Sequence, residues 1–200
     1  MSEIKLTNTV ERPSEAQRAR ARSLTIMTEA FFFYLSMTRI HYAMIEGIYD
    51  GCLNTEPPYE MTTEDYLEGE NIETLGCIIL CSRIAIFHYY NRQLDISEWY
   101  DDLLMVAELD EPEYELDGSN EPHEFVEMVE SIASKSDEET SGFDMFEATC
   151  KAVLRRIKNP KVWSAIEHLT DRLEANGWLS GEEIEEYLYD KFGEPIFCDV

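Results

Sequence analysis

Apolar residues between positions 14 and 48 recur at spacings of three and four, which is the period of an α-helix. A helix with two adjacent apolar stripes is packed on most of its surface. The Pro13-Ser14-Glu15 segment is typical of a helix start. Proline has no backbone N–H, and the first turn of a helix does not need that donor. The pattern therefore predicts one long central helix over 14–48. Its stripes are Leu24, Met27, Phe31, Tyr34, Thr38, Tyr42 and Ile45, and Ile26, Ala30, Phe33, Met37, Ile40 and Met44.

A second apolar run predicts another buried helix over about 72–92. Shorter amphipathic stretches predict helices from about 95, over 122–135, through 143–157, over 160–176 and from 180 to about 192. Asn159-Pro160 and Asn176-Gly177 are typical of a helix start and a helix end. A turn and loop are expected over 50–58, and a short helix is expected near Thr62. No segment gives a convincing sheet.

These segments indicate an all-α fold of about seven helices packed round two buried central helices. A small, separate C-terminal helical lobe is an alternative for the end of the chain. The expected organisation is a flexible arm or short strand over 1–12, an N-terminal helical core over 13–109, and an acidic loop plus helical lobe over 110–200. One continuous domain is the alternative, because 200 residues suit either arrangement.

The amount and distribution of charge say more about possible partners than the overall composition does. The chain has 42 acidic and 16 basic residues, a formal net charge of −26. The window Asp101–Cys150 alone holds 17 acidic residues and one lysine. Such a field repels nucleic acid and anionic membranes and attracts basic partners. Hydrophobic residues make up 44% of the chain, which is enough for a core and argues against disorder.

The two longest apolar runs are predicted to be buried helices and not membrane spans. Residues 24–45 are interrupted by Glu29, Arg39 and His41, and residues 75–90 are short for a span and contain Arg83. The polar first residues lack a hydrophobic signal segment. An odd number of cysteines without a zinc pattern indicates reduced thiols. We therefore expect a cytoplasmic protein.

Glutamates at 121, 124, 127 and 130 recur every third residue along one side of a predicted helix, about 4.5 Å apart along its axis. One strand of a duplex presents a phosphate about every 3.4 Å. Carboxylates at this density could imitate phosphates against a basic groove, and Tyr114 is the candidate aromatic anchor. The predicted partner-binding residues are Glu108, Asp110, Glu111, Glu113, Tyr114, Glu115, Asp117, Glu121, Glu124, Glu127, Glu130, Glu182, Glu183 and Glu186.

These observations favour a non-catalytic inhibitor that docks on a basic nucleic-acid-binding protein, such as a nuclease, and blocks its substrate. Phage- or plasmid-borne inhibitors of restriction or CRISPR nucleases act in this way, as do some antitoxin and immunity proteins. The partner is a protein and not nucleic acid or membrane, no cofactor or metal is expected, and a homodimer stays open. The charge is also compatible with a structural adaptor whose acidic face is merely solvated, or with an adaptation to salt.

Basic residues also cluster. Lys151, Arg155 and Lys158 share a helix face, and we interpret them as internal ion-pair partners of the acidic segments or as a subunit contact. Direct binding of nucleic acid through this face stays open, although it must overcome the net charge.

The segment from Arg83 to His88 has the spacing Arg-x4-His, which resembles the catalytic motif of HEPN-type helical ribonucleases. The resemblance covers six residues and implies a ribonuclease that uses Arg83 and His88. In that family the residue after the arginine is commonly polar, whereas here it is Ile84. Five helical positions separate the two side chains by about 140°, so they do not share a face cleanly.

No metal motif is found. None of the four histidines has a glutamate three residues before it, as a di-iron bundle requires. A calcium-loop pattern at 137–148 fails because its twelfth position is Ala148 and not glutamate.

Overall fold

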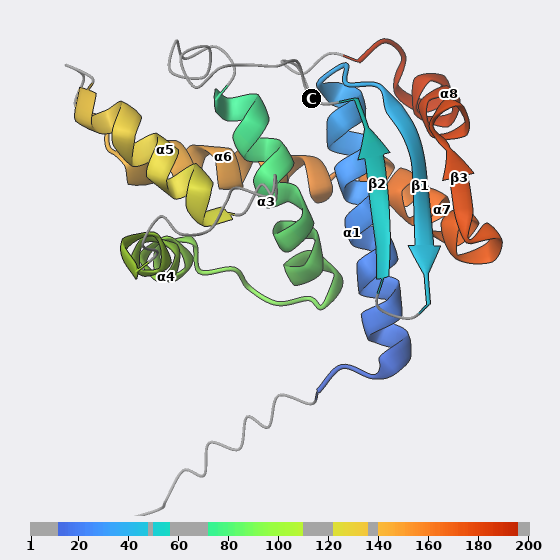
Figure 1. The fold of residues 1–200 in the computed structure, drawn as a ribbon, viewed down its shortest axis with the longest axis horizontal. Helices are drawn as coiled ribbons and strands as arrows, with labels where there is room; N and C mark the ends of the chain where they lie inside the picture. Colours follow the sequence, from blue (N-terminus) through green and yellow to red (C-terminus); the bar gives the residue numbers. More distant parts are fainter. Residues whose placement is uncertain (1–11, 48–49, 57–71, 110–121, 136–139, 196–200) are drawn as a thin grey trace, which may run out of the picture.

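The computed structural model describes residues 12–47, 50–56, 72–109, 122–135 and 140–195. Within these ranges the chain forms seven helices and a small antiparallel sheet of three strands (Figure 1). The predicted largely helical class is confirmed, and the expectation of no sheet is wrong. The elements are α1 Glu15–Leu35, β1 Ile40–Glu46, β2 Asp50–Thr55, α3 Ile72–Tyr89, α4 Ile96–Leu109, α5 Pro122–Lys135, α6 Gly142–Ile157, α7 Pro160–Asn176, β3 Trp178–Ser180 and α8 Gly181–Phe192.

Helices α1 and α3 pack against each other in the middle of the molecule (Figure 1). Phe31 and Phe32 of α1 and Leu80 and Ile84 of α3 are almost fully buried. Helices α4, α5 and α6 cover one side of this pair, and the sheet with α7 and α8 covers the other. One cluster of buried residues connects these layers, and Tyr100 is the buried residue of α4 that belongs to it. The described elements therefore share one hydrophobic core.

The long helix predicted over 14–48 is wrong beyond residue 35. The backbone N–H of Ser36 still bonds to the carbonyl of Phe32, but Met37 turns to a φ of 59° and the chain leaves the helix. Residues 40–46 then form strand β1. Apolar residues are so frequent here that they satisfy the helical period and a strand equally well, and periodicity alone cannot separate the two.

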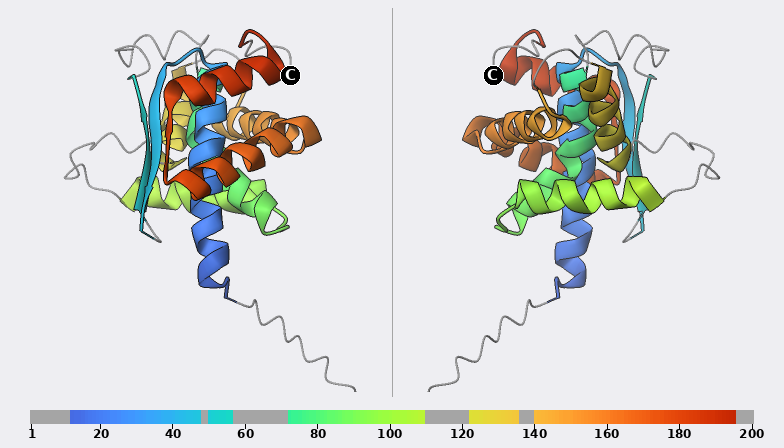
Figure 2. Two further views of the ribbon diagram at one scale, coloured as in Figure 1. Left: turned by 90° about the vertical axis from the view of Figure 1, so that its right-hand side faces the viewer. Right: turned by 90° about the vertical axis from the view of Figure 1, so that its left-hand side faces the viewer.

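Strand β1 is the central strand of the sheet, in the order β2-β1-β3. Ala43 of β1 lies opposite Leu53 of β2 and Leu179 of β3. The loop expected over 50–58 is therefore wrong for residues 50–55, which return as a hairpin strand. Figure 2 shows the sheet standing along one side of α1, with α8 across the end of β1.

The helix starts after residue 120 follow the sequence signals closely. Helix α5 spans the predicted residues, and the α6 and α8 starts carry reciprocal capping bonds from Ser141 and Ser180. Helix α7 begins after the cap Asn159 and ends at Gly177, whose φ is 73°. These predictions are confirmed, because capping depends on bonds within a few residues.

Three predicted segments lie outside the described residues: the arm over 1–11, the short helix near Thr62 and the acidic loop over 110–121. Among the described helices, α3 alone has the length and composition to cross a membrane, but 56% of it is buried inside the protein. A core helix passes the same test.

Candidate acidic docking surface

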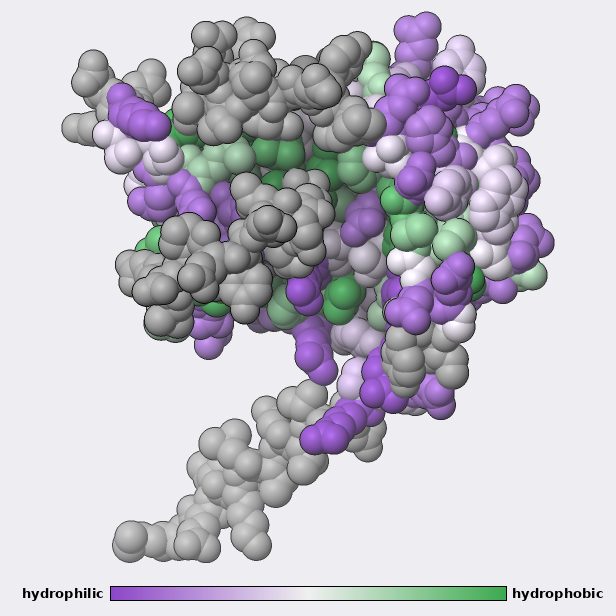
Figure 3. All heavy atoms as spheres, in the orientation of Figure 1, coloured by the Kyte–Doolittle hydropathy of each residue, from purple (hydrophilic) through white to green (hydrophobic). Residues whose placement is uncertain are grey.

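Helix α8 divides cleanly into a buried face and a charged face. Ile184 and Leu188 are fully buried, whereas Glu182, Glu186 and Asp190 are exposed. The three acids are four residues apart, so their carboxylates follow one another about every 6 Å along the helix. Hydrophilic residues gather over this part of the surface, at the upper right of the view (Figure 3). Among the residues that the structure describes, none forms an ion pair with these three acids.

The fold holds this row of acids in place through two contacts with β1. The backbone N–H of Ile40 donates to Glu185 Oε1 over 2.8 Å. Gly181 lies so close to β1 that an added Cβ would meet the Ile40 carbonyl oxygen at 1.6 Å. Strand β3 fixes the start of α8 further, because Ser180 pairs with Tyr42.

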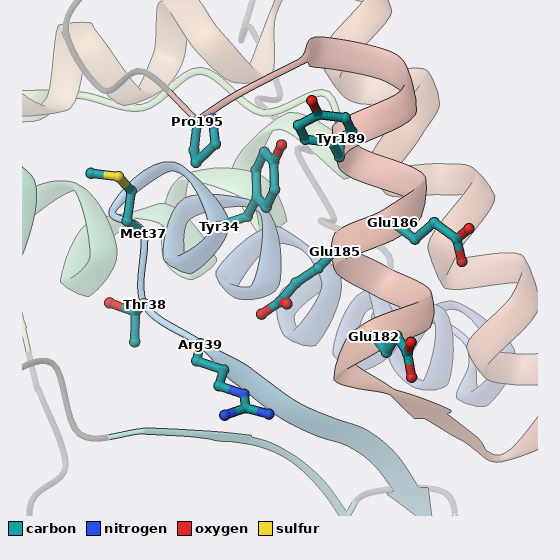
Figure 4. Close-up of a pocket in the computed structure, with 9 residues that line it drawn as sticks. All are labelled: Tyr34, Met37, Thr38, Arg39, Glu182, Glu185, Glu186, Tyr189 and Pro195. Carbon is teal, nitrogen blue, oxygen red and sulfur yellow. The ribbon is translucent and has the colours of Figure 1, made fainter.

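A groove runs between α8 and the turn that joins α1 to β1 (Figure 4). Its volume is about 590 Å³, within the range of ligand pockets. Glu185 projects from α8 toward Tyr34 and Arg39, and Glu186 extends away from them along the outer side of the helix. The groove is lined by Tyr34, Met37, Thr38, Arg39, Glu182, Glu185, Glu186, Tyr189 and Pro195.

The floor of the groove is negative and partly apolar. Burial raises the pKa of Tyr34, and the nearby Tyr189 and Glu185 add to the effect. Tyr34 stays protonated, and its hydroxyl donates a hydrogen bond to the carbonyl oxygen of Gly193. Among the described residues of the lining, Arg39 is the one basic residue, and its Nη1 lies 3.7 Å from Glu56.

Glu183, a predicted partner-binding residue, makes contacts within the fold. It accepts bonds from the backbone N–H and the hydroxyl of Ser180, and it forms an ion pair with Arg172 at 2.8 Å. The backbone bond from Ser180 is the main cause of its lowered pKa, and Arg172 contributes less. Of the predicted α8 residues, Glu182 and Glu186 therefore remain as outward charges.

The glutamates of α5 do not form one outward row. Glu127 is exposed, Glu124 is half-buried, and Glu130 is half-buried and accepts a bond from the Tyr100 hydroxyl. Burial, followed by Glu130, raises the pKa of Tyr100 well above its usual value. A step of three residues rotates the side chain by about 60° each time, which turns Glu130 toward α4.

The remaining predicted binding residues are not placed by the structure. Glu108 belongs to the last turn of α4, but its side chain lies outside the described part of the chain. The others lie outside the described residues altogether: Asp110, Glu111, Glu113, Tyr114, Glu115, Asp117 and Glu121.

Several acids are neutralised by the chain's own cations. Arg20 of α1 pairs with Asp171 and Glu174 of α7 at 2.7 and 2.8 Å. Lys151 pairs with Glu147 one helical turn earlier in α6. Internal pairing of the basic cluster is thus observed for Lys151, while the nearby Arg155 is exposed, and no carboxylate of the described residues pairs with it.

Arg83 and His88 have different surroundings on α3. Arg83 is exposed, whereas His88 packs edge-on against Trp163 with the ring centroids 4.5 Å apart. Burial lowers the pKa of His88, and the positive charge of Lys158 lowers it further. A neutral histidine packed against tryptophan is typical of a structural contact. The contact described for His88 is with Trp163 and not with Arg83.

Thiols and metal-ligand side chains form no site in the part of the chain that is described. Cys77, Cys81 and Cys150 are buried, and burial raises the pKa of Cys77 and of Cys150 to about 12. Across the described ranges, no group of three histidine, cysteine or acidic side chains could hold a metal ion.

Sequence reasoning missed the apolar side of the groove. Met37 and Tyr34 were placed on the stripes of a longer helix, and Tyr189 was not singled out. No periodic signal could have found them, because the turn at Met37 decides which residues face α8.

No protein-family model matches the chain, and no curated protein is significantly similar to it.

Proposed function

We propose that this protein is a non-catalytic inhibitor whose acidic surface docks on a basic nucleic-acid-binding protein and excludes nucleic acid. The row of Glu182, Glu186 and Asp190 on α8 is the observation that carries the proposal. These carboxylates are exposed, are held on a helix fixed to β1, and have no ion-pair partner within the described residues. A surface in this state can pair with the lysines and arginines of another protein.

The electrostatics of the whole chain support the same partner. Residues 57–71, 110–121 and 136–139 together contain 14 acidic residues and no basic one. Their charge adds to the field around the molecule, whatever their arrangement. A negative field attracts a basic protein from a distance and speeds association at low salt. The α8 row alone has about half the charge density of one duplex strand, so its role is competition for selected cations and not a full copy of DNA.

The proposal is tested by removing the same amount of charge from two different places. The α8 variant combines Glu182→Gln, Glu186→Gln and Asp190→Asn. The control variant combines Glu15→Gln, Glu98→Gln and Asp102→Asn, which are exposed acids on α1 and α4. Both variants lose three negative charges, so they weaken the long-range field equally. They differ only in whether the α8 row is intact.

The measurement has two steps. Basic proteins are first captured from a lysate at low salt and eluted with high salt. Each purified candidate is then bound to a fluorescent DNA duplex, and displacement of the duplex by this protein is followed by anisotropy. We expect displacement by the wild type and the control variant but much weaker displacement by the α8 variant. Equal displacement by both variants, or failure of the wild type to displace the duplex, contradicts the proposal.

A further inference from the structure

The groove beside the α8 row combines apolar, aromatic and acidic groups in one place. The side chains of Tyr189 and Met37 are 54% and 74% exposed, and both line the groove. Glu182 and Glu185 line the same groove. A second hollow of about 480 Å³ is lined by Arg39, Ile40, His41 and Ser180 to Glu182, and it shares Arg39, Glu182 and Glu185 with the first.

The turn that bears Met37 is held rigidly. Its backbone N–H bonds to the carbonyl of Tyr34 at 3.1 Å, and the N–H of Thr38 bonds to the carbonyl of Phe33 at 3.0 Å. The hydroxyls of Ser36 and Thr38 are 2.9 Å apart on either side. Met37 itself has a φ of 59°, a conformation that side chains other than glycine rarely adopt. The backbone that carries this exposed apolar side chain is therefore held in place.

The acidic side of the groove has a carboxylate oxygen to spare. Glu185 Oε1 accepts the Ile40 N–H, and the carboxylate as a whole points toward Tyr34 and Arg39 (Figure 4). Arg39 forms an ion pair with Glu56, which is not part of the lining. The glutamates of the lining therefore outnumber its positive charges, and the groove is negative. Phosphates and acidic peptides are repelled by this arrangement, and a cation with an apolar stem fits it.

We propose that the groove between α8 and the Met37 turn receives an arginine side chain of the basic partner. The aliphatic stem packs against Met37, the guanidinium lies over the Tyr189 ring, and its N–H groups donate to Glu182 and Glu185. Arginine is favoured over lysine because its flat guanidinium stacks on aromatic rings and donates to two oxygens at once. This inference rests on the proposed function and specifies which side chain of the partner is recognised.

The test uses fluorescein-labelled hexa-arginine and hexa-lysine as probes, at about 0.05 and 0.15 M NaCl, because screening weakens purely diffuse attraction across this range. Tyr189→Ala removes the ring, and Tyr189→Phe keeps it. Met37→Gly removes the apolar side chain at a φ that glycine tolerates, so it protects the fold. Glu127→Gln on α5 removes one charge far along the sequence from the groove and serves as the charge control for Glu182→Gln.

We expect hexa-arginine to bind more tightly than hexa-lysine. Tyr189→Ala and Met37→Gly each weaken the binding of hexa-arginine about fivefold and leave that of hexa-lysine nearly unchanged. Tyr189→Phe and Glu127→Gln bind as the wild type, and Glu182→Gln weakens both peptides. The inference is overturned if Tyr189→Ala and Met37→Gly bind hexa-arginine like the wild type, or if the two peptides bind equally.

The two proposals fail in different ways. If the groove variants still displace DNA from the captured protein while the α8 triple variant does not, the groove inference fails and the proposed function stands. If hexa-arginine depends on the groove while the α8 and control triple variants displace DNA equally, the proposed function fails and the groove inference stands.

Discussion

The backbone N–H of Ile40 donates a hydrogen bond of 2.8 Å to the side chain of Glu185. This bond joins the first residue of β1 to the middle of α8, 145 positions later. The central strand of the sheet and the last helix are thereby fixed to each other, and the outward acids of α8 are held beside the Met37 turn. Glu185 thus supports the fold, while Glu182 and Glu186 of the same helix remain outward.

Removing the Glu185 carboxylate is predicted to destabilise the protein. Glu185→Ala leaves the Ile40 N–H without its acceptor, which costs about 1–2 kcal/mol of unfolding free energy. Glu185→Gln keeps an acceptor oxygen, so we expect a smaller loss. Urea denaturation of the two variants and the wild type measures the difference. Equal loss in the Gln and Ala variants would show that charge, and not the bond to Ile40, is what matters.

Gly181 is predicted to tolerate no side chain. In Gly181→Ala the new Cβ would lie 1.6 Å from the Ile40 carbonyl oxygen, so α8 and β1 must move apart. We expect a loss of about 2 kcal/mol or more in urea denaturation. Gly47→Ala is the matched control. Gly47 has open space around it and a φ of 65°, so its cost is that of the backbone conformation alone, about 1 kcal/mol. A smaller loss at Gly181 than at Gly47 would contradict the close contact.

Glu29 is predicted to make stability depend on pH near neutrality. Its carboxyl lies against Ser82 between α1 and α3, and burial raises its pKa to about 7. The folded state therefore holds this proton more tightly than the unfolded chain does. The stabilising contribution is complete below the ordinary pKa of a glutamate, falls progressively as the pH rises from that value, and is lost once the pH has passed through 7, with a limit on the order of 3 kcal/mol.

The variant Glu29→Gln isolates this effect, because glutamine is neutral at every pH and keeps the shape of the side chain. We expect the two proteins to have similar unfolding free energies near pH 4, below the ordinary pKa of a glutamate, and the variant to be more stable near pH 8.5. Urea denaturation across this range gives the difference curve, in which the titration of the other acids cancels. A flat difference curve would show that folding does not raise the pKa of Glu29.

The sequence predicts local features of this fold well and tertiary ones poorly. The caps at Asn159 and Ser180 are found where the sequence predicts helix starts, since each depends on a residue two or three positions away. The end of α1 at Leu35 was missed, because it depends on strands β2 and β3 pairing with residues 40–46. A strand that is made by distant partners leaves little trace in its own sequence.

The candidate site divides in the same way. Exposure of Glu182 and Glu186 follows from the helical period of α8, which Ile184 and Leu188 set. The role of Glu130 could not be predicted, because its bond to Tyr100 joins side chains from different elements. The bonds of Glu183 to Ser180 do follow from a local capping pattern, whereas its ion pair with Arg172 of α7 does not. Charge counts every carboxylate alike, whereas the fold decides which of them remain outward.

The cysteines are predicted to differ sharply in reactivity. Cys52 is exposed on β2, whereas Cys77, Cys81 and Cys150 are buried. Burial raises the pKa of the Cys77 and Cys150 thiols to about 12, so almost none of the reactive thiolate is present at neutral pH. Brief treatment with iodoacetamide followed by peptide mass spectrometry should label Cys52 and spare Cys77, Cys81 and Cys150. Rapid labelling of Cys77 in the native protein would contradict the packing of α3 against α6.

Phe146 is predicted to be the residue on which the packing of α4, α5 and α6 depends most. Its side chain is fully buried, and its ring lies within 5.2–6.2 Å of the rings of Tyr100, Trp99 and Phe125. Phe146→Ala leaves a cavity that these rings cannot fill, and we expect a loss of about 3–5 kcal/mol. Phe146→Leu keeps most of the volume and should cost less.

Hydrogen exchange distinguishes a local loss from a general one. In Phe146→Ala we expect faster amide exchange in α4 and α5, which contact α6 directly, and little change at the pairing of β1 with β3. The α8 row and its groove lie on that distant side, so hexa-arginine binding should persist in the folded fraction. Uniform acceleration in every element would instead show that the core unfolds as a single unit, without a separable α4–α6 layer.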